Sequence, residues 1–258
     1  MGRLEKAEPF FTEKAFLEKE LELDIGIDNS DDDHSLELGL ELDWVFFERL
    51  ELGAEVPYVF LFPDGESSTS AFSDIGLTAT ALICCTTPYT PFYLSLRGGI
   101  DLPTGDEDKG IGGTGEWGFS LNTSYFFPVE DISLWGIQLQ LAYAQQLKFS
   151  DEQKSLANML NINKTHSKDI IWNAAFSQEY FNGRFAPIFE FLGTSTVDAM
   201  QSDDEGTILE LGFGFWVSPF SDTSPFNAVN LGTAAKFPVT ERKETTSSFL
   251  FVISYGFD

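Results

Sequence analysis

The chain of 258 residues carries 41 acidic side chains against 15 Lys and Arg, a net charge of −26 at pH 7. This charge excludes a nucleic-acid-binding protein, because the phosphates would be repelled. Hydrophobic residues still make up 43% of the chain, including 26 Phe, so it is too apolar for a disordered acidic protein. The length suits a single barrel domain or at most two small soluble domains.

No stretch reaches the roughly 18–20 apolar residues that a membrane-spanning helix needs. The first residues, Met1 to Glu5, have no apolar core of a signal peptide, so we interpret the sequence as a mature chain with a start Met. The two cysteines, Cys84 and Cys85, are adjacent, which excludes a spaced disulfide framework and a Cys-rich metal site. A vicinal disulfide or two packed thiols remain, and packing is favoured.

Residues 1–16 are the first predicted segment and show no strand alternation. Phe10, Phe11, Ala15 and Phe16 could serve a short helix or a plug inside a lumen, and a disordered periplasmic tail fits equally well. From residue 17 to 258 apolar and polar residues alternate, which predicts strands with one apolar and one polar face.

The alternating segments follow one another along the whole chain. The first sets Leu21, Leu23, Ile25 and Ile27 against Glu20, Glu22 and Asp24. Later segments run from Leu36 to Phe46, Leu50 to Phe60, Ile75 to Ala81, Phe92 to Ile100, Trp117 to Phe127, Leu139 to Tyr143, Ile170 to Phe176, Phe185 to Phe191, Leu209 to Phe215, Val229 to Phe237 and Phe249 to Phe257. This predicts roughly twelve strands of about ten residues, the length of a tilted strand that crosses a membrane.

The predicted connections alternate in length. Short turns follow strands 2, 4, 6 and 8, as at Phe47 to Arg49 and at Asn182-Gly183. Longer polar loops follow strands 1, 3, 5, 7, 9 and 11, as at 103–113 and 150–168, and aromatic residues gather near both ends of the strands. This layout predicts an all-β, antiparallel transmembrane β-barrel in the bacterial outer membrane, with short periplasmic turns and longer extracellular loops. The alternative is a soluble β-protein with an aromatic core.

Several segments resemble a family of bacterial outer-membrane barrels, the transporters of the MetA pathway of phenol degradation. The resemblance is carried by Glu8 to Glu13, Leu50 to Tyr58, Phe72 to Leu77, Leu102 to Asp106 and the Gly-rich loop Gly110 to Gly115. It covers the first half of the chain well and the second half only as a barrel pattern. It implies an outer-membrane location and the passage of small organic molecules, and it implies no catalytic residues.

The motifs that suggest catalysis are weak. Gly110 to Gly115 matches G-x-G-x-x-G, but a strand pattern follows it where a dinucleotide site needs a helix, so we interpret it as a surface loop. The two histidines, His34 and His166, lie in predicted loops. Only His166 could serve a barrel hydrolase, as a remote candidate. We therefore predict no enzyme, no catalytic residues, no cofactor and no resident metal.

The acidic runs Asp31 to Asp33 and Asp203 to Glu205 fall in predicted loops. Solvated loop charge is the favoured interpretation. Divalent cations such as Ca²⁺ or Mg²⁺ are the alternative partners, since they bind several carboxylate oxygens and would reduce repulsion from lipopolysaccharide. The other expected partners are outer-membrane lipid and small-molecule solutes.

The polar faces predict a lumen with an acidic wall and a sparser basic one. Its carboxylates come from strands 1–4 and its bases from later strands: Glu18, Glu20, Glu22, Asp24, Glu37, Glu41, Asp43, Glu51, Glu55 and Asp74 against Arg97, Lys148, Arg184 and Lys236. Such a field selects and orients solutes, although an ion-paired interior that only stabilises the fold is an equal alternative. We predict a narrow pore or transporter for small, organic or aromatic solutes; a non-conducting structural or assembly-partner barrel is the alternative.

Overall fold

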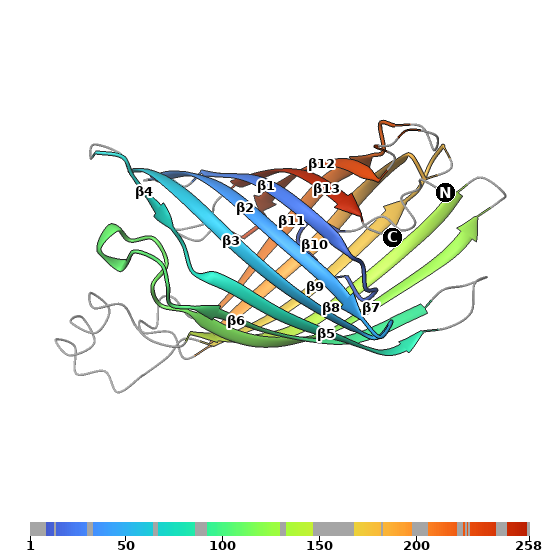
Figure 1. Ribbon diagram of the computed structural model, residues 1–258, viewed down its shortest axis with the longest axis horizontal. Helices are drawn as coiled ribbons and strands as arrows, with labels where there is room; N and C mark the ends of the chain where they lie inside the picture. Colours follow the sequence, from blue (N-terminus) through green and yellow to red (C-terminus); the bar gives the residue numbers. More distant parts are fainter. Residues whose placement is uncertain are drawn as a thin grey trace.

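The computed structural model describes residues 9–12, 14–29, 33–63, 67–85, 92–129, 133–146, 168–181, 183–197, 206–220, 224, 226, 228–240 and 247–256. Within these ranges the chain is almost entirely β-strand and forms one closed barrel (Figure 1). One short 3₁₀ helix, η1 (Glu107–Lys109), lies in the link between two strands. No helix of the described part is long and apolar enough to cross a membrane.

The strands are long and follow the predicted alternating segments. They are β1 (Glu20–Asn29), β2 (Asp33–Phe46), β3 (Leu50–Pro63), β4 (Thr69–Phe72), β5 (Ile75–Cys85), β6 (Phe92–Leu102), β7 (Glu116–Val129), β8 (Ser133–Gln146), β9 (Lys168–Gln178), β10 (Phe185–Val197), β11 (Gly206–Val217), β12 (Val229–Pro238) and β13 (Ser247–Gly256).

Every strand pairs antiparallel with its neighbours, and the sheet closes on itself. β1 pairs with β2 on one side and with β13 on the other, so Glu20 lies opposite both Asp43 and Gly256. β4 and β5 both pair with β3, along different parts of its length, and together occupy one position in the wall. The barrel therefore has twelve strand positions, which confirms the predicted fold class. A closed sheet has no free edges, so no backbone N–H or C=O group of an edge strand is left without a hydrogen-bond partner in the membrane.

The two faces of the wall have opposite chemistry. Large apolar side chains point outward and are exposed, as Leu40 and Leu42 on β2 illustrate. The inner face buries polar groups, and Ser95, Asn122 and Ser124 are fully enclosed. This arrangement is the reverse of a soluble β-protein and matches a barrel whose outer face meets lipid. Aromatic rings contact one another on the wall near both rims, for example Phe127 with Trp135 and Phe237 with Phe249.

Short connections lie at the rim where β1 begins and β13 ends. The turn of Phe47 to Arg49 joins β2 to β3, and Phe47 and Glu48 have φ values of 53° and 60°. The prediction of a long loop between the first two strands was wrong, because β1 and β2 stay paired as far as Asn29 and His34 and only residues 30–32 separate the two strands.

Cys84 and Cys85, at the end of β5, are exposed and form no disulfide.

Candidate permeation pathway

Three neighbouring strands place their carboxylates on the inner face of the barrel. The register sets Glu22 of β1 opposite Glu41 of β2, which in turn lies opposite Glu55 of β3. Neighbouring strands lie about 4.8 Å apart, so these side chains form a row across the wall. We call the inward carboxylates of these three strands the acidic wall: Glu20, Glu22, Asp24, Glu37, Glu41, Asp43, Glu51 and Glu55.

The acidic wall is dense enough for its members to share a cation. One carboxylate oxygen from each of Glu22, Asp24 and Glu41 lies within 4.8 Å of the others, and all three side chains are partly accessible. Charges of the same sign at this separation repel, and a cation between them lowers the electrostatic free energy. The local chemistry therefore favours positive charge in the lumen.

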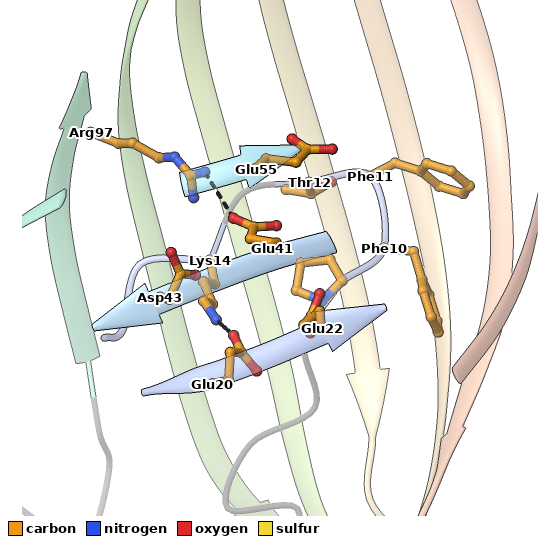
Figure 2. A pocket seen from close by; sticks show the side chains of 11 residues that line it. Phe10, Phe11, Thr12, Lys14, Glu20, Glu22, Glu41, Asp43, Glu55 and Arg97 are labelled. Carbon is orange, nitrogen blue, oxygen red and sulfur yellow. Dashed lines mark hydrogen bonds and ion pairs between the residues drawn. The ribbon is translucent and has the colours of Figure 1, made fainter. Parts of the chain in front are cut away.

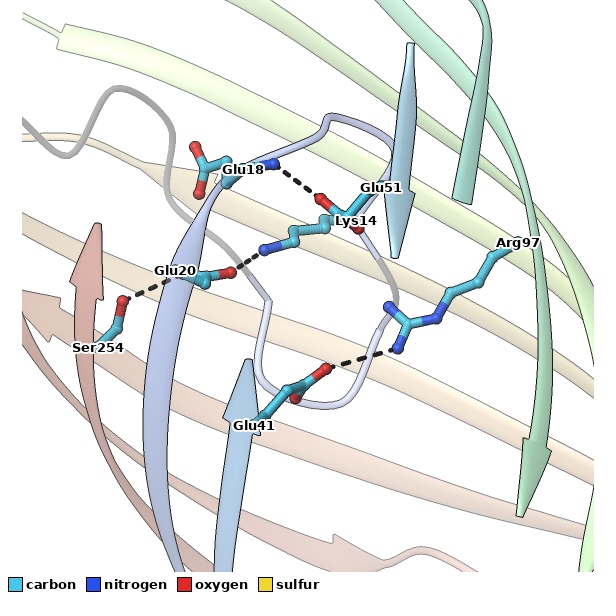
Figure 3. A network of polar contacts seen from close by, with 7 residues as sticks. All are labelled: Lys14, Glu18, Glu20, Glu41, Glu51, Arg97 and Ser254. Carbon is cyan, nitrogen blue, oxygen red and sulfur yellow. Dashed lines mark hydrogen bonds and ion pairs between the residues drawn. The ribbon is translucent and has the colours of Figure 1, made fainter. Parts of the chain in front are cut away.

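Basic groups and backbone N–H groups offset part of the negative charge (Figure 3). Arg97 of β6, which lies three strand positions along the wall from β2, points into the lumen, and its Nη2 lies 3.7 Å from Oε1 of Glu41. Lys14, which precedes the first strand, forms an ion pair with Glu20, and the Ser254 hydroxyl donates to the same carboxylate at 3.1 Å. The N–H of Glu18 donates to Oε2 of Glu51 at 2.8 Å. The wall is thus partly paired and keeps a net negative charge.

The described residues between 9 and 16 lie inside the barrel, and we call them the luminal segment. The N–H groups of Phe10 and Phe11 donate to the carboxylate of Glu190 on β10, at 2.8 and 3.1 Å. Further along, the Ala15 N–H donates to Oγ of Ser124 at 3.2 Å. Glu190 is 1% exposed, so its charge is satisfied by the backbone of this segment instead of by water.

Aromatic side chains anchor the two ends of the luminal segment. The Phe10 ring stacks on Trp216 of β11, with the ring centroids 4.9 Å apart. Phe16 is almost fully buried and packs edge-on against Phe126 and Tyr93. Because these rings are enclosed by the inner wall, burial of apolar area holds the segment in addition to its hydrogen bonds.

Glycines on the inner wall make room for this segment. A Cβ on Gly214 would lie 2.5 Å from the Phe10 ring, and one on Gly232 would lie 2.6 Å from it. A Cβ on Gly212 would come within 3.1 Å of Phe11. The three glycines form a flat socket on β11 and β12 that any larger residue would fill.

Among the described residues, two cavities lie along the acidic wall. The first, about 230 Å³, lies between the wall and the luminal segment (Figure 2). The second, about 310 Å³, lies nearer the long loops and is lined by Glu37, Glu55, Asp101 and Glu116. Glu55 lines both cavities, so the acidic side chains border the lumen along the same part of the wall.

The sequence matches, over residues 40–242, the model of a protein family described as "Putative MetA-pathway of phenol degradation". The chain belongs to this family. The resemblance predicted from the first half of the sequence is therefore confirmed, and the match extends well into the second half. No curated protein sequence matches the chain.

Solved structures similar to this family member are outer-membrane barrels. An outer membrane channel from Pseudomonas putida F1 has a TM-score of 0.62 and 12% identity, covering 98% of this chain and 100% of its own. The NanC porin has a TM-score of 0.54 and 11% identity, over 91% and 98% of the two chains. The KdgM porin has a TM-score of 0.52 and 9% identity, over 92% and 99%. With its closed wall and apolar outer face, this member of the family is an outer-membrane β-barrel.

The other predicted lumen residues have different surroundings. Asp74 lies in the link between β4 and β5, where it accepts hydrogen bonds from the N–H groups of the Gly-rich loop. Lys236 pairs with Glu210 at 3.4 Å and lies over the Phe11 ring. Arg184 is exposed in the turn before β10, at the rim. Lys148 and His166 lie outside the described residues, as do Asp31, Asp32 and Asp203 to Glu205.

Sequence reasoning missed several residues of the pathway. Glu190 follows the inward register of β10 between Phe189 and Phe191, so the alternation could have found it. Glu116 and Asp101 stand at paired positions on β7 and β6, and both line the second cavity. The sequence gives no signal for the role of Lys14, because this residue lies in a segment without alternation. Only the folded barrel brings it to Glu20.

Proposed function

We propose that the chain is a narrow, cation-preferring channel for small solutes. The observation that carries this proposal is the acidic wall, which lines two cavities of the lumen and is paired with fewer basic groups than it has carboxylates. Rings of charged side chains set the ion preference of pores. The similar structures are named as channels and porins, which agrees with this role. At their low sequence identity, the similarity itself establishes only the fold.

The solutes that we propose are small organic molecules, including aromatic ones. The family description names phenol degradation, which supports this class. The luminal segment and the small cavity volumes favour solutes of modest size. Their passage needs no catalytic residue, and we propose a transport role without enzymatic activity.

A second candidate function is a non-conducting structural barrel. It is favoured by the luminal segment, because Glu190, Trp216 and Phe126 hold that segment firmly across the lumen. Conductance separates the two candidates directly. A channel conducts ions in a planar bilayer, whereas a barrel sealed by its own segment does not.

The decisive experiment measures reversal potentials of the refolded protein in a KCl gradient. The wild-type protein should prefer K⁺, and the double substitution Glu22→Gln/Glu41→Gln should move the reversal potential toward zero, because it removes two luminal charges. The matched control, Glu48→Gln/Asp108→Asn, removes two exposed charges outside the lumen. Anion preference in the wild-type protein, or equal shifts in both variants, would contradict the proposed pathway.

A further inference from the structure

Two phenylalanines at the tips of turns have the most exposed large apolar side chains in the described part of the chain. Phe47, between β2 and β3, is 91% exposed, and Phe181, between β9 and β10, is 76% exposed. Both turns belong to the rim where β1 begins and β13 ends (Figure 1). A phenyl ring in water forfeits the free energy that burial of its apolar area would supply, and the barrel itself does not cover these rings.

The backbone of both phenylalanines is also strained. Phe47 and Phe181 each have a φ of 53°, and Glu48, next to Phe47, is the other non-glycine residue with a positive φ in the described ranges. A bulky side chain is rare in this left-handed region, and Asn or Gly is preferred in such turns. Asn or Gly at either position would remove both the strain and the exposed ring. Strain that coincides with an exposed ring at both tips indicates a role for the ring outside the turn.

The two turns lie on opposite sides of the barrel. In the closed sheet, β3, β4 with β5, β6, β7, β8 and β9 separate them in one direction, and β10, β11, β12, β13, β1 and β2 separate them in the other. Since β4 and β5 share one position, six strand positions lie between the turns on each side. Contacts at two opposite points of a rim fix the tilt of a cylinder as well as its depth in a membrane.

The apolar outer surface of the wall continues to both tips. Phe46, the last residue of β2, is an exposed side chain of the outward series and directly precedes Phe47. At the other tip, the ring centroid of Tyr180 lies 6.4 Å from that of Phe181 and 6.4 Å from that of Phe185, the first residue of β10. The tips therefore lie at the edge of the lipid-facing surface, where acyl chains give way to headgroups.

An exposed arginine accompanies each ring. Arg49 follows Phe47 by two residues, and Arg184 follows Phe181 by three. A guanidinium group binds phosphate oxygens through two parallel N–H bonds, and a ring beside it suits the acyl chains below the phosphate. We propose that these two turn tips are anchoring sites for the phospholipid headgroups of the leaflet on the short-turn side. The lipid covers the rings, and the arginines bind the phosphodiester groups.

Fluorescence quenching locates the turn tips relative to the bilayer. Phe47→Cys and Phe181→Cys, with both native cysteines changed to serine, take a bimane label and are refolded into phosphatidylcholine vesicles that contain brominated lipid. Leu139→Cys on the outward face is the lipid reference, and Asp108→Cys in a long connection is the water reference. Bromine should quench both tips at least about half as strongly as position 139. Quenching by aqueous iodide as strong as at position 108, without quenching by bromine, overturns the anchoring sites and favours a partner in the periplasm.

The contribution of the rings is measured with Phe47→Ala/Phe181→Ala. Alanine keeps the Cβ, so the strain of the left-handed backbone stays and only the rings are lost. The equilibrium constant for unfolding by urea in phosphatidylcholine vesicles should rise by about tenfold or more, because two apolar side chains no longer contact lipid. Glu48→Ala is the matched control, since it lies at the same tip with a positive φ, and should change this constant by less than about twofold.

Unchanged or greater stability of the alanine pair overturns the anchoring sites. If the alanine pair fails to refold, the quenching measurement decides alone.

The phosphate contact is tested by changing the lipid. Arg49→Gln/Arg184→Gln should raise the equilibrium constant for unfolding by about threefold or more in phosphatidylcholine, because charge-assisted hydrogen bonds to phosphate are lost. In vesicles of digalactosyldiacylglycerol, which has no phosphate, the same variant should match the wild-type protein within about twofold. Equal losses in both lipids would mean that the arginines stabilise the turns themselves, which overturns the assignment of phospholipid headgroups as the ligand.

Discussion

Glu190 illustrates how a single lumen carboxylate can serve the chain's own backbone. Its side chain is buried on the inner face of β10, where the carboxylate accepts hydrogen bonds from the backbone N–H groups of Phe10 and Phe11. Charge-assisted hydrogen bonds of this kind are stronger than neutral ones, and a buried charge without them would be costly. Glu190 therefore fixes the luminal segment instead of contributing to the ion preference of the acidic wall.

Glu190→Gln should release the luminal segment. The substitution removes the charge and places an amide NH₂ opposite backbone N–H donors. The free energy that holds the segment in the lumen should therefore fall by about 1–3 kcal/mol. Trypsin should then cleave after Lys14, which mass spectrometry detects, and the mean conductance should rise. Glu37→Gln is the control, because Glu37 is an inward carboxylate that lines the cavity to which the luminal segment does not contribute. Equal protection of Lys14 in both variants would show that Glu190 does not hold the segment.

Gly214→Ala should displace Phe10 from its socket without unfolding the barrel. The new methyl group would lie 2.5 Å from the Phe10 ring and 2.8 Å from Cβ of Ala234 on β12, so the ring has to leave Trp216 and the two strands have to adjust locally. Trp fluorescence should shift to longer wavelength as water reaches Trp216. Gly26→Ala is the matched control, since its Cβ meets only Glu37 at an ordinary 3.7 Å. An unchanged spectrum for Gly214→Ala would contradict the socket.

At the scale of the element, period-two alternation predicted nearly all of the wall. Leu40 and Leu42 point outward and Glu41 inward because successive side chains of a strand alternate. The ends of strands were less predictable, as the polar residues Asp28, Asn29 and His34 continue the pairing of β1 and β2 instead of forming a loop. In a barrel the hydrogen-bonded pairing of two strands can extend beyond the apolar band that faces lipid. The change from apolar to polar residues therefore does not mark where a strand ends.

The candidate site was only partly predictable for a related reason. The acidic wall follows from the alternation, since Glu22, Glu41 and Glu55 occupy inward positions of consecutive strands. Asp74 has the same polarity, but its role depends on a loop more than thirty residues away that folds back onto it. The contacts of Phe10 with β11 likewise join distant parts of the chain, and the local pattern of residues holds no signal for them.

A charge at the middle of an outward face should destabilise the barrel in a depth-dependent way. Leu139→Arg on β8 places a cation on the lipid face and should lower the free energy of unfolding in vesicles by about 2–4 kcal/mol. Val239→Arg, just beyond the end of β12 at the loop rim, should cost about 0–1 kcal/mol. Urea titration in lipid vesicles measures both, and similar costs at the two positions would contradict the assignment of the lipid face.

At the scale of the whole molecule, the outer apolar surface should make folding depend on detergent or lipid. The exposed Leu, Phe and Trp side chains form a continuous band around the wall, which water cannot solvate at low cost. The folded protein in detergent should migrate differently from the boiled protein on gel electrophoresis. A monodisperse, folded species in plain buffer would be incompatible with the membrane barrel.

The closing pair of strands has a consequence for the order of assembly. β13 hydrogen-bonds to β1 and β12, and the contact of Glu20 with Gly256 spans nearly the whole chain. Contacts of such high sequence separation carry a large loop-closure entropy and form late in folding. Every intermediate before that step exposes two unpaired edges, which are prone to aggregate. The pairing of β13 with β1 and β12 therefore determines whether a nascent chain forms the closed barrel or remains open to proteolysis.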